Sequence, residues 1–136
     1  MQRAGRPQNI NPEELAPARG FSHVTVAGDT VWLGGQIGSD ATGTVVEPGD
    51  VVAQFARAIG NVSIALRAAG CSPSDTVKLT YYVTDLKLYR ENLAAIGPAY
   101  REVFGRHYPA STLIEVTSLF DPAALVEVDA VAVRRR

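Results

Sequence analysis

Two carboxylates near the end of the chain are the first candidates for chemistry. Residues 125–133 alternate in the manner of a β-strand, so Glu127 and Asp129 share one face. The opposite face is apolar, with Val126, Val128, Ala130 and Ala132. Burying a carboxylate without a partner costs free energy and disfavours its charged form. These two acids are therefore expected either to have polar partners or to take part in a reaction.

A second candidate is the run Gly34-Gly35-Gln36, which ends a predicted strand. Two adjacent glycines indicate either a bend of the backbone or a close approach by another group. The amide of Gln36 beside them has two interpretations. It either contacts a bound ligand or is a structural amide at a β-bulge, and the residues alone favour neither.

Two further side chains with reactive groups are interpreted as structural. His107 lies alone in a predicted loop, where a solvated or locally hydrogen-bonded ring is usual. Cys71 follows Gly70 at a predicted helix end, and no histidine lies nearby in sequence to activate it, so a small buried thiol is expected. A single cysteine excludes an intrachain disulfide framework and any multi-cysteine metal site. No metal site is therefore predicted.

The composition indicates one domain of ordinary globular type. The chain has 136 residues, of which 46% are hydrophobic, enough for one core with two packed layers. Its net charge of −1 gives no basic face for nucleic acid. The N-terminus lacks the apolar run of a secretory signal, and no segment reaches the ~20 apolar residues of a membrane span. A cytoplasmic protein without membrane contact is expected.

Local patterns predict the elements that must position these candidates. Alternation predicts strands over 21–27, 30–35, 77–84, 109–119 and 125–133, with a hairpin turn at Gly28-Asp29 and a short strand possible at 44–46. Apolar residues at helical spacing predict helices over 50–70 and 86–104, the second with a kink or restart at Gly97-Pro98. Residues 1–19 are predicted to form an extended arm, and residues 20–136 a single domain.

Two helices among mostly strands favour a two-layer α+β sandwich, with both helices on one face of the sheet. The other face would carry Trp32, Val131 and Val133 or their neighbours. Burying these apolar side chains requires another subunit, so an oligomer is expected.

Six segments in order resemble the Rid (YjgF/YER057c/UK114) superfamily of reactive enamine/imine deaminases. They are Gly20-Phe21-Ser22, the hairpin ending in Gly34-Gly35-Gln36, the helix over 50–70, the strand from Val77 to Asp85, Pro109-Ala110-Ser111-Thr112, and Val126 to Ala130. The resemblance spans residues 20–133. It implies a chorismate-mutase-like two-layer fold with a mixed sheet of about six strands. It also implies a homotrimer that holds small-molecule ligands in clefts between subunits.

Superfamily members with established chemistry hydrolyse 2-imino acids, or their enamine tautomers, to 2-keto acids and ammonia without a metal or organic cofactor. In them an arginine after Pro-Ala holds the substrate carboxylate, and a glutamate on the last strand positions or activates water. Glu127 matches that glutamate, so the resemblance implies a catalytic role for it. Ser111 stands in the place of the arginine. The ligand-binding residues implied for this chain are Phe21, Gly35, Gln36, Ser111 and Thr112.

The serine argues against an ordinary 2-imino acid as substrate. A neutral hydrogen bond contributes about 1 kcal/mol and a charge-assisted one about 1.5–3 kcal/mol, so a carboxylate would bind roughly tenfold to a hundredfold less tightly. Leu113 and Gly97 also replace a cysteine and an asparagine that are usual in the superfamily. The sequence leaves open whether Arg19 or Arg106 of an adjacent subunit takes over the role of the arginine.

Three functions are compared on this basis. The first is a cofactor-independent deaminase that hydrolyses an imine or enamine without a carboxylate at the usual place. The alternative is a trimer that binds a small metabolite without turnover, in which Glu127 is a structural acceptor. The third, an endoribonuclease or translation inhibitor, rests on an older family label, and the net charge of −1 disfavours it.

Overall fold

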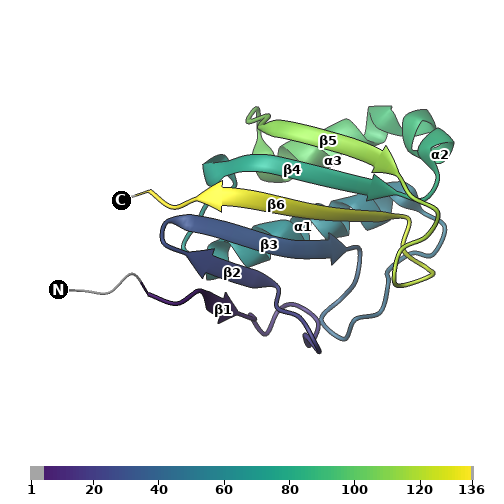
Figure 1. Ribbon diagram of the computed structural model, residues 1–136. Helices are drawn as coiled ribbons and strands as arrows, with labels where there is room; N and C mark the ends of the chain where they lie inside the picture. Colours follow the sequence, from purple (N-terminus) through teal and green to yellow (C-terminus); the bar gives the residue numbers. More distant parts are fainter. Residues whose placement is uncertain (1–4, 136) are drawn as a thin grey trace.

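The computed structural model describes residues 5–135 as a mixed six-stranded sheet with helices on one face (Figure 1). Its strands are β1 (Gln8–Ile10), β2 (Val24–Ala27), β3 (Thr30–Ile37), β4 (Thr76–Val83), β5 (Ala110–Glu115) and β6 (Val126–Val133). Its helices are α1 (Val51–Ala68), the 3-10 helix η1 (Pro73–Asp75), α2 (Leu86–Glu91) and α3 (Leu93–Phe104). The strand order is β1-β2-β3-β6-β4-β5, and neighbours are antiparallel except β4 and β5. The predicted α+β class with a mixed sheet is confirmed.

The hairpin of β2 and β3 forms at the predicted turn, where Gly28 adopts a φ of 62° that favours glycine. However, β2 begins at Val24 and not at Phe21. The backbone N–H of His23 donates to Oδ1 of Asn11 at 2.8 Å, so it is not available to a neighbouring strand. The carbonyl of His23 still accepts a hydrogen bond from the N–H of Gly34 at 2.9 Å, so the contact with β3 continues one residue before β2 begins.

The long helix α1 matches its prediction. Asp50 caps its N-terminus by accepting a hydrogen bond from the backbone N–H of Ala53 at 3.0 Å, and Gly70, with a φ of 78°, follows its C-terminus. The predicted apolar stripe is buried against the sheet: Val51, Phe55, Ile59, Val62 and Leu66. Each such side chain contributes about 1.5–3 kcal/mol when it leaves water, so α1 is a main support of the covered face.

The second helical region differs from its prediction, because the break lies at Asn92 and not at Gly97-Pro98. The Asn92 side chain donates to the carbonyl of Leu88 at 2.8 Å, which satisfies an acceptor at the end of α2. Pro98 lies inside α3. The proline ring is tolerated there because Gly97 has no Cβ to clash with it. Buried side chains before and after it also hold the helix in place: Ile96, Tyr100 and Phe104.

The N-terminal segment joins the sheet as its edge strand. β1 pairs with β2, and the hydroxyl of Thr25 donates to Oδ1 of Asn9 at 2.8 Å. Leu15 is buried in the core. Of the predicted arm, residues 1–4 lie outside the described residues. The short strand predicted at 44–46 is reduced to a single bridge between Ser39 and Val45.

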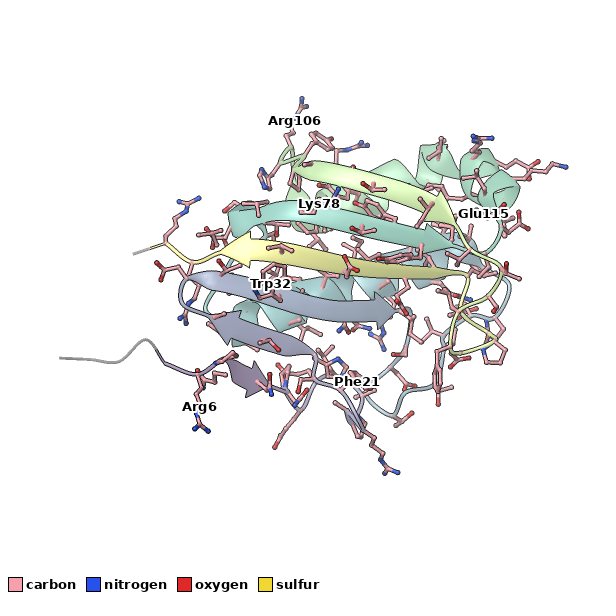
Figure 2. The ribbon with its side chains drawn as sticks, in the orientation of Figure 1. Arg6, Phe21, Trp32, Lys78, Arg106 and Glu115 are labelled. Atoms are coloured by element: carbon pink, nitrogen blue, oxygen red, sulfur yellow. The ribbon has the colours of Figure 1, made fainter. Side chains whose placement is uncertain are left out.

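The last strand, β6, lies between β3 and β4 and brings both halves of the sheet together. Its predicted alternation is confirmed, because the side chains on the helix side are buried: Val126, Val128, Ala130 and Ala132. The face without helices carries Glu127, Asp129 and, from β3, Trp32 (Figure 2). Trp32 is 51% exposed there. Within residues 5–135, no helix is long and apolar enough to cross a membrane.

Candidate active site

The carboxylate of Glu127 lies directly over the backbone of Gly35. Glu127 pairs with Ile37 of β3, and a register shift between Leu33 and Gln36 marks a bulge at the two glycines. A Cβ atom on Gly35 would lie 2.8 Å from Cγ of Glu127 and closer still to its carboxylate. A larger residue would displace the acid, so Gly35 positions it.

The surroundings of Glu127 favour its protonated form. Burial raises the pKa of Glu127, and the negative charge of Asp129 raises it further. Among residues 5–135, its carboxylate has no hydrogen-bond or ion-pair partner. A carboxyl group with a raised pKa suits general base catalysis near neutral pH. Asp129 instead accepts a hydrogen bond from the Tyr82 hydroxyl at 3.1 Å, which supports the structural role predicted for it.

Gln36 acts as a structural amide at the bulge. Its Nε2 lies 3.0 Å from Nδ1 of His23 and 3.3 Å from the carbonyl oxygen of Gly34. An amide nitrogen only donates, so Nδ1 accepts and the ring proton is on Nε2. That nitrogen donates to the carbonyl of Ala16 at 2.6 Å. These two hydrogen bonds hold the ring of His23, a residue not predicted from the sequence, in the wall of the cavity that contains Glu127.

A cavity of about 540 Å³ opens in front of Glu127. Its walls include Arg19, Phe21, His23, Gln36, Phe120 and Glu127. The Phe21 ring packs edge-on against His23, with centroids 5.3 Å apart, and it lies at the lower edge of the sheet in Figure 2. The ring of Phe120 is fully exposed. The cavity therefore combines the carboxylates of Glu127 and Asp121 with one arginine and aromatic walls, which suits a small organic molecule. It brings together four predicted site residues: Phe21, Gly35, Gln36 and Glu127.

Two buried amides on α1 hold the walls of this cavity. Gln54 accepts from the N–H of Leu125 at 2.8 Å and donates to the carbonyl of Ala123 at 3.2 Å, which fixes the loop before β6. Asn61 donates to the carbonyls of Ile37 and Ser39, at 3.0 and 2.9 Å, where β3 ends. Neither residue was predicted from the sequence to have a role at the site. The available signal was a pair of amides seven residues apart, beside the apolar stripe of the helix.

The structure does not bring Ser111 together with Glu127. In the sheet, Ser111 pairs with Leu79 and Leu79 with Ala130, which faces the helices. Directly paired residues point to the same face, so Ser111 and Glu127 lie on opposite faces of one sheet. Thr112 lies on the face without helices, called the open face below, where its hydroxyl accepts a hydrogen bond from Nζ of Lys78 at 2.7 Å.

Ser111 lines a second cavity, of about 360 Å³, between β5 and α3. Its floor is aromatic and apolar, and its rim carries Arg101 and Tyr108. The side chain of Arg106 is not part of this wall. In Figure 2 it points away from the sheet beyond the start of β5.

The remaining candidates have structural roles, as predicted. Nε2 of His107 donates to the carbonyl of Thr76 at 2.8 Å, so the loop histidine is locally hydrogen-bonded. Cys71 is buried, and burial raises the pKa of its thiol, which makes the reactive thiolate scarcer. Within residues 5–135, no three His, Cys, Asp or Glu side chains gather at one point.

Known proteins resemble this chain over most of its length. A 2-iminobutanoate/2-iminopropanoate deaminase of Capra hircus is 29% identical over 123 residues, which are 90% of this chain and 84% of that protein. The structure of the YjgF gene product from E. coli has a TM-score of 0.81 and 32% identity, covering 94% of this chain and 99% of that one. The structure of E. coli TdcF with bound serine has a TM-score of 0.80 and 30% identity, and the match covers 94% of this chain and 99% of TdcF.

A family model covers the same region. Residues 11–134 match the model described as endoribonuclease L-PSP. This match includes β2 to β6, all the helices and every residue of the two cavities. The chain therefore belongs to the endoribonuclease L-PSP family, the Rid (YjgF/YER057c/UK114) superfamily that its motifs resemble.

Proposed function

We propose that this protein is a cofactor-independent deaminase that hydrolyses an imine or enamine to a carbonyl compound and ammonia. The observation that carries the proposal is the carboxylate of Glu127. It is partly buried, has a raised pKa and, within the described chain, has no partner where it lies over Gly35 in a cavity. The deaminase relative, 29% identical over 90% of the chain, supports the same chemistry.

Glu127 has two steps to perform. It first accepts a proton from a water molecule while the water oxygen forms a bond to the carbon of the C=N group. The nitrogen takes up a proton from solvent, giving a neutral tetrahedral carbinolamine. Glu127 then returns its proton to the nitrogen, the C–N bond breaks, and the hydroxyl group loses its proton to solvent, so that a carbonyl forms as ammonia leaves. One imine and one water thus yield one carbonyl compound and one ammonia.

The complete site is proposed to lie between subunits of a homotrimer. Glu127 with Gly35 and Phe21 forms one half, and the cavity beside Ser111 of a neighbouring chain forms the other. Two observations support this arrangement. Ser111 and Glu127 face opposite sides of one sheet, so a single chain cannot place both against one small ligand. The open sheet face also leaves Trp32 half exposed, and a partner would cover it.

The substrate is proposed to differ from an ordinary 2-imino acid. Such a molecule carries its carboxylate on the carbon of the C=N bond. The neutral hydroxyl of Ser111 holds that carboxylate less well than an arginine, by an expected factor of roughly ten to a hundred. A substrate without an acid group at this position should bind equally well whether the residue is an arginine or Ser111.

Ammonia release from imines generated in situ tests the proposal. We expect little turnover of 2-iminobutanoate and clear turnover of the imine formed from an aliphatic amine by an amine oxidase. Glu127→Gln removes the base and should lower kcat/KM roughly 10²- to 10⁴-fold. Asp129→Asn is the matched control. Its kcat/KM should stay within about tenfold of that of the unmodified protein, because Asp129 contacts Tyr82 and does not line the cavity.

The pH profile gives an independent measure. The reacting base must be charged, so kcat/KM should rise with pH and level off above the pKa of Glu127. That inflection should lie above the range of an ordinary glutamate, because burial raises this pKa. Full activity of Glu127→Gln would refute the mechanism. Saturable binding without turnover of any imine would favour the non-catalytic alternative, and tight RNA binding with a steep salt dependence would favour the third.

A further inference from the structure

We infer that Arg101 is the anion-binding residue of this protein, and that its ligand is a carboxylate with an apolar body whose acid group is remote from the reacting carbon. This inference deepens the proposed function, and its statement about the reacting carbon rests on that function. The binding site itself stands on the cavity between α3 and β5.

The first observation is the position of the guanidinium group. Arg101 follows Gly97 by four residues in α3, so the two lie one above the other on the helix surface. Nη1 of Arg101 is 3.3 Å from the place that a Cβ atom of Gly97 would occupy. The guanidinium therefore occupies the space that a side chain at position 97 would fill.

The second observation is the charge of the cavity. Of the described side chains that line it, Arg101 alone is charged. Within residues 5–135 this arginine has no acidic partner. The floor is built from apolar and aromatic side chains: Phe55, Leu79, Tyr81, Tyr89 and Ile96. A cation at the edge of such a low-dielectric surface attracts an anion more strongly than it would in open water.

The third observation is the set of groups beside the arginine. Ser111 lines the same cavity and contributes a neutral hydroxyl. The rings of Tyr108 and Tyr100 stack 5.4 Å apart at 12°, and Tyr108 remains 63% exposed at the rim. The planar guanidinium fork of Arg101 fits a carboxylate, the hydroxyl of Ser111 remains available to a neutral group of the ligand, and an exposed aromatic ring offers a surface for an apolar body.

The position of the charge determines the class of ligand. Arg101 approaches from helix α3, whereas the arginine that Ser111 replaces would approach from strand β5. A carboxylate held from the helix is displaced from the Ser111 end of the cavity. The carbon that reacts at Glu127 must then be separated from the acid group by additional atoms. A 4-imino acid meets this requirement, and a 2-imino acid does not.

Direct binding tests the site without any reaction. Isothermal titration of the whole protein with 3-phenylpropanoate is compared with titration of the neutral amide, 3-phenylpropanamide. We expect Arg101→Met to weaken binding of the acid roughly tenfold to a hundredfold and to leave binding of the amide unchanged. Arg101→Lys should retain part of the affinity. Arg106→Met, which removes an exposed arginine outside the cavity, should bind like the unmodified protein.

The outcomes separate this inference from the proposed function. Equal affinity of Arg101→Met and the unmodified protein for the acid would overturn the inference. So would equal affinity of the unmodified protein for the acid and the amide. Binding that depends on Arg101 and persists in Glu127→Gln would support the anion site even if no imine is hydrolysed. In the turnover assay, 4-iminobutanoate should be hydrolysed at least tenfold faster than 2-iminobutanoate, and this preference should disappear in Arg101→Met.

Discussion

At the scale of single residues, Glu127 and Gly35 depend on each other. The bulge between Leu33 and Gln36 brings a residue without a side chain beneath the acid. The acid can therefore lie against the backbone and lose solvent, which raises its pKa. The amide of Gln36 maintains the bulge through His23 and the carbonyl of Gly34. The raised pKa of Glu127 thus depends on how closely β3 and β6 approach each other at the bulge.

Replacement of Gly35 should lower both reactivity and stability. In Gly35→Ala the new methyl would overlap the carboxylate of Glu127, which must move aside. We expect a loss of about 1–3 kcal/mol in the free energy of unfolding, typical of overpacking, and a drop in kcat/KM of roughly tenfold to a hundredfold. Urea unfolding and ammonia release measure the two effects.

The matched control is Gly60→Ala in α1, where the added methyl has no neighbour within 4 Å. The free energy of unfolding of this variant should be higher by about 0.5–1 kcal/mol, because alanine is more favourable than glycine inside a helix. If Gly35→Ala kept the full rate, the close contact would have no part in positioning the acid.

At the scale of elements, the structure shows which local signals were sufficient. Capping by Asp50, the positive φ of Gly28 and the alternation of residues 126–133 act between close neighbours in sequence, and the corresponding elements form as predicted. Gly97-Pro98 was also a strong local signal, yet α3 runs through it. Packing of Ile96 and Tyr100 in the core outweighs the local preference there.

Pro98→Ala tests this explanation. The proline inside α3 deprives the helix of one backbone hydrogen bond, at a cost of about 3 kcal/mol. Part of this cost is offset because proline restricts the unfolded chain, by about 1 kcal/mol. The variant should therefore be more stable by about 1–2 kcal/mol in urea unfolding. Pro122→Ala, in the exposed loop before β6, should instead lower the free energy of unfolding by about 0.4–1 kcal/mol, because the unfolded chain gains freedom. A destabilised Pro98→Ala would show that the ring has a packing role.

The site was predictable to a smaller extent than the elements. Glu127, Gly35, Gln36 and Phe21 line one cavity, and each lies in a segment with a recognisable motif. The opposite orientation of Ser111 was not predictable, because it depends on the long-range register of β5, β4 and β6. The role of Gln54 in fixing the loop before β6 was likewise not predictable, because its partners, Ala123 and Leu125, lie 69 and 71 residues further along the chain.

At the scale of the whole molecule, the sheet has one covered face and one open face. Helices α1 to α3 cover the first (Figure 1). The second exposes Trp32 and Val133, and the carboxyl groups of Glu127 and Asp129 lie on the same face. An apolar ring among polar groups on a flat surface is typical of a contact between subunits. The proposed trimer would bury this ring.

A charge on the open face should therefore prevent assembly without unfolding the chain. We expect the unmodified protein to elute with the mass of three chains in size-exclusion chromatography with light scattering. Trp32→Lys should shift it to the mass of one chain, because a buried charge without a partner is costly. Glu91→Lys, on an exposed position of α2, should leave the mass unchanged. A monomeric unmodified protein would contradict the proposed trimer.

The central place of β6 has a consequence for how the chain acquires its fold during synthesis. The strands that flank it, β3 and β4, are translated long before it, and they pair with each other nowhere in the sheet. Until β6 leaves the ribosome, the nascent chain holds two separate half-sheets, each with an unpaired edge. Such edges invite association with other chains. The strand that carries Glu127 is thus also the one that pairs both free edges. We therefore expect a message truncated before residue 126 to yield an aggregating polypeptide.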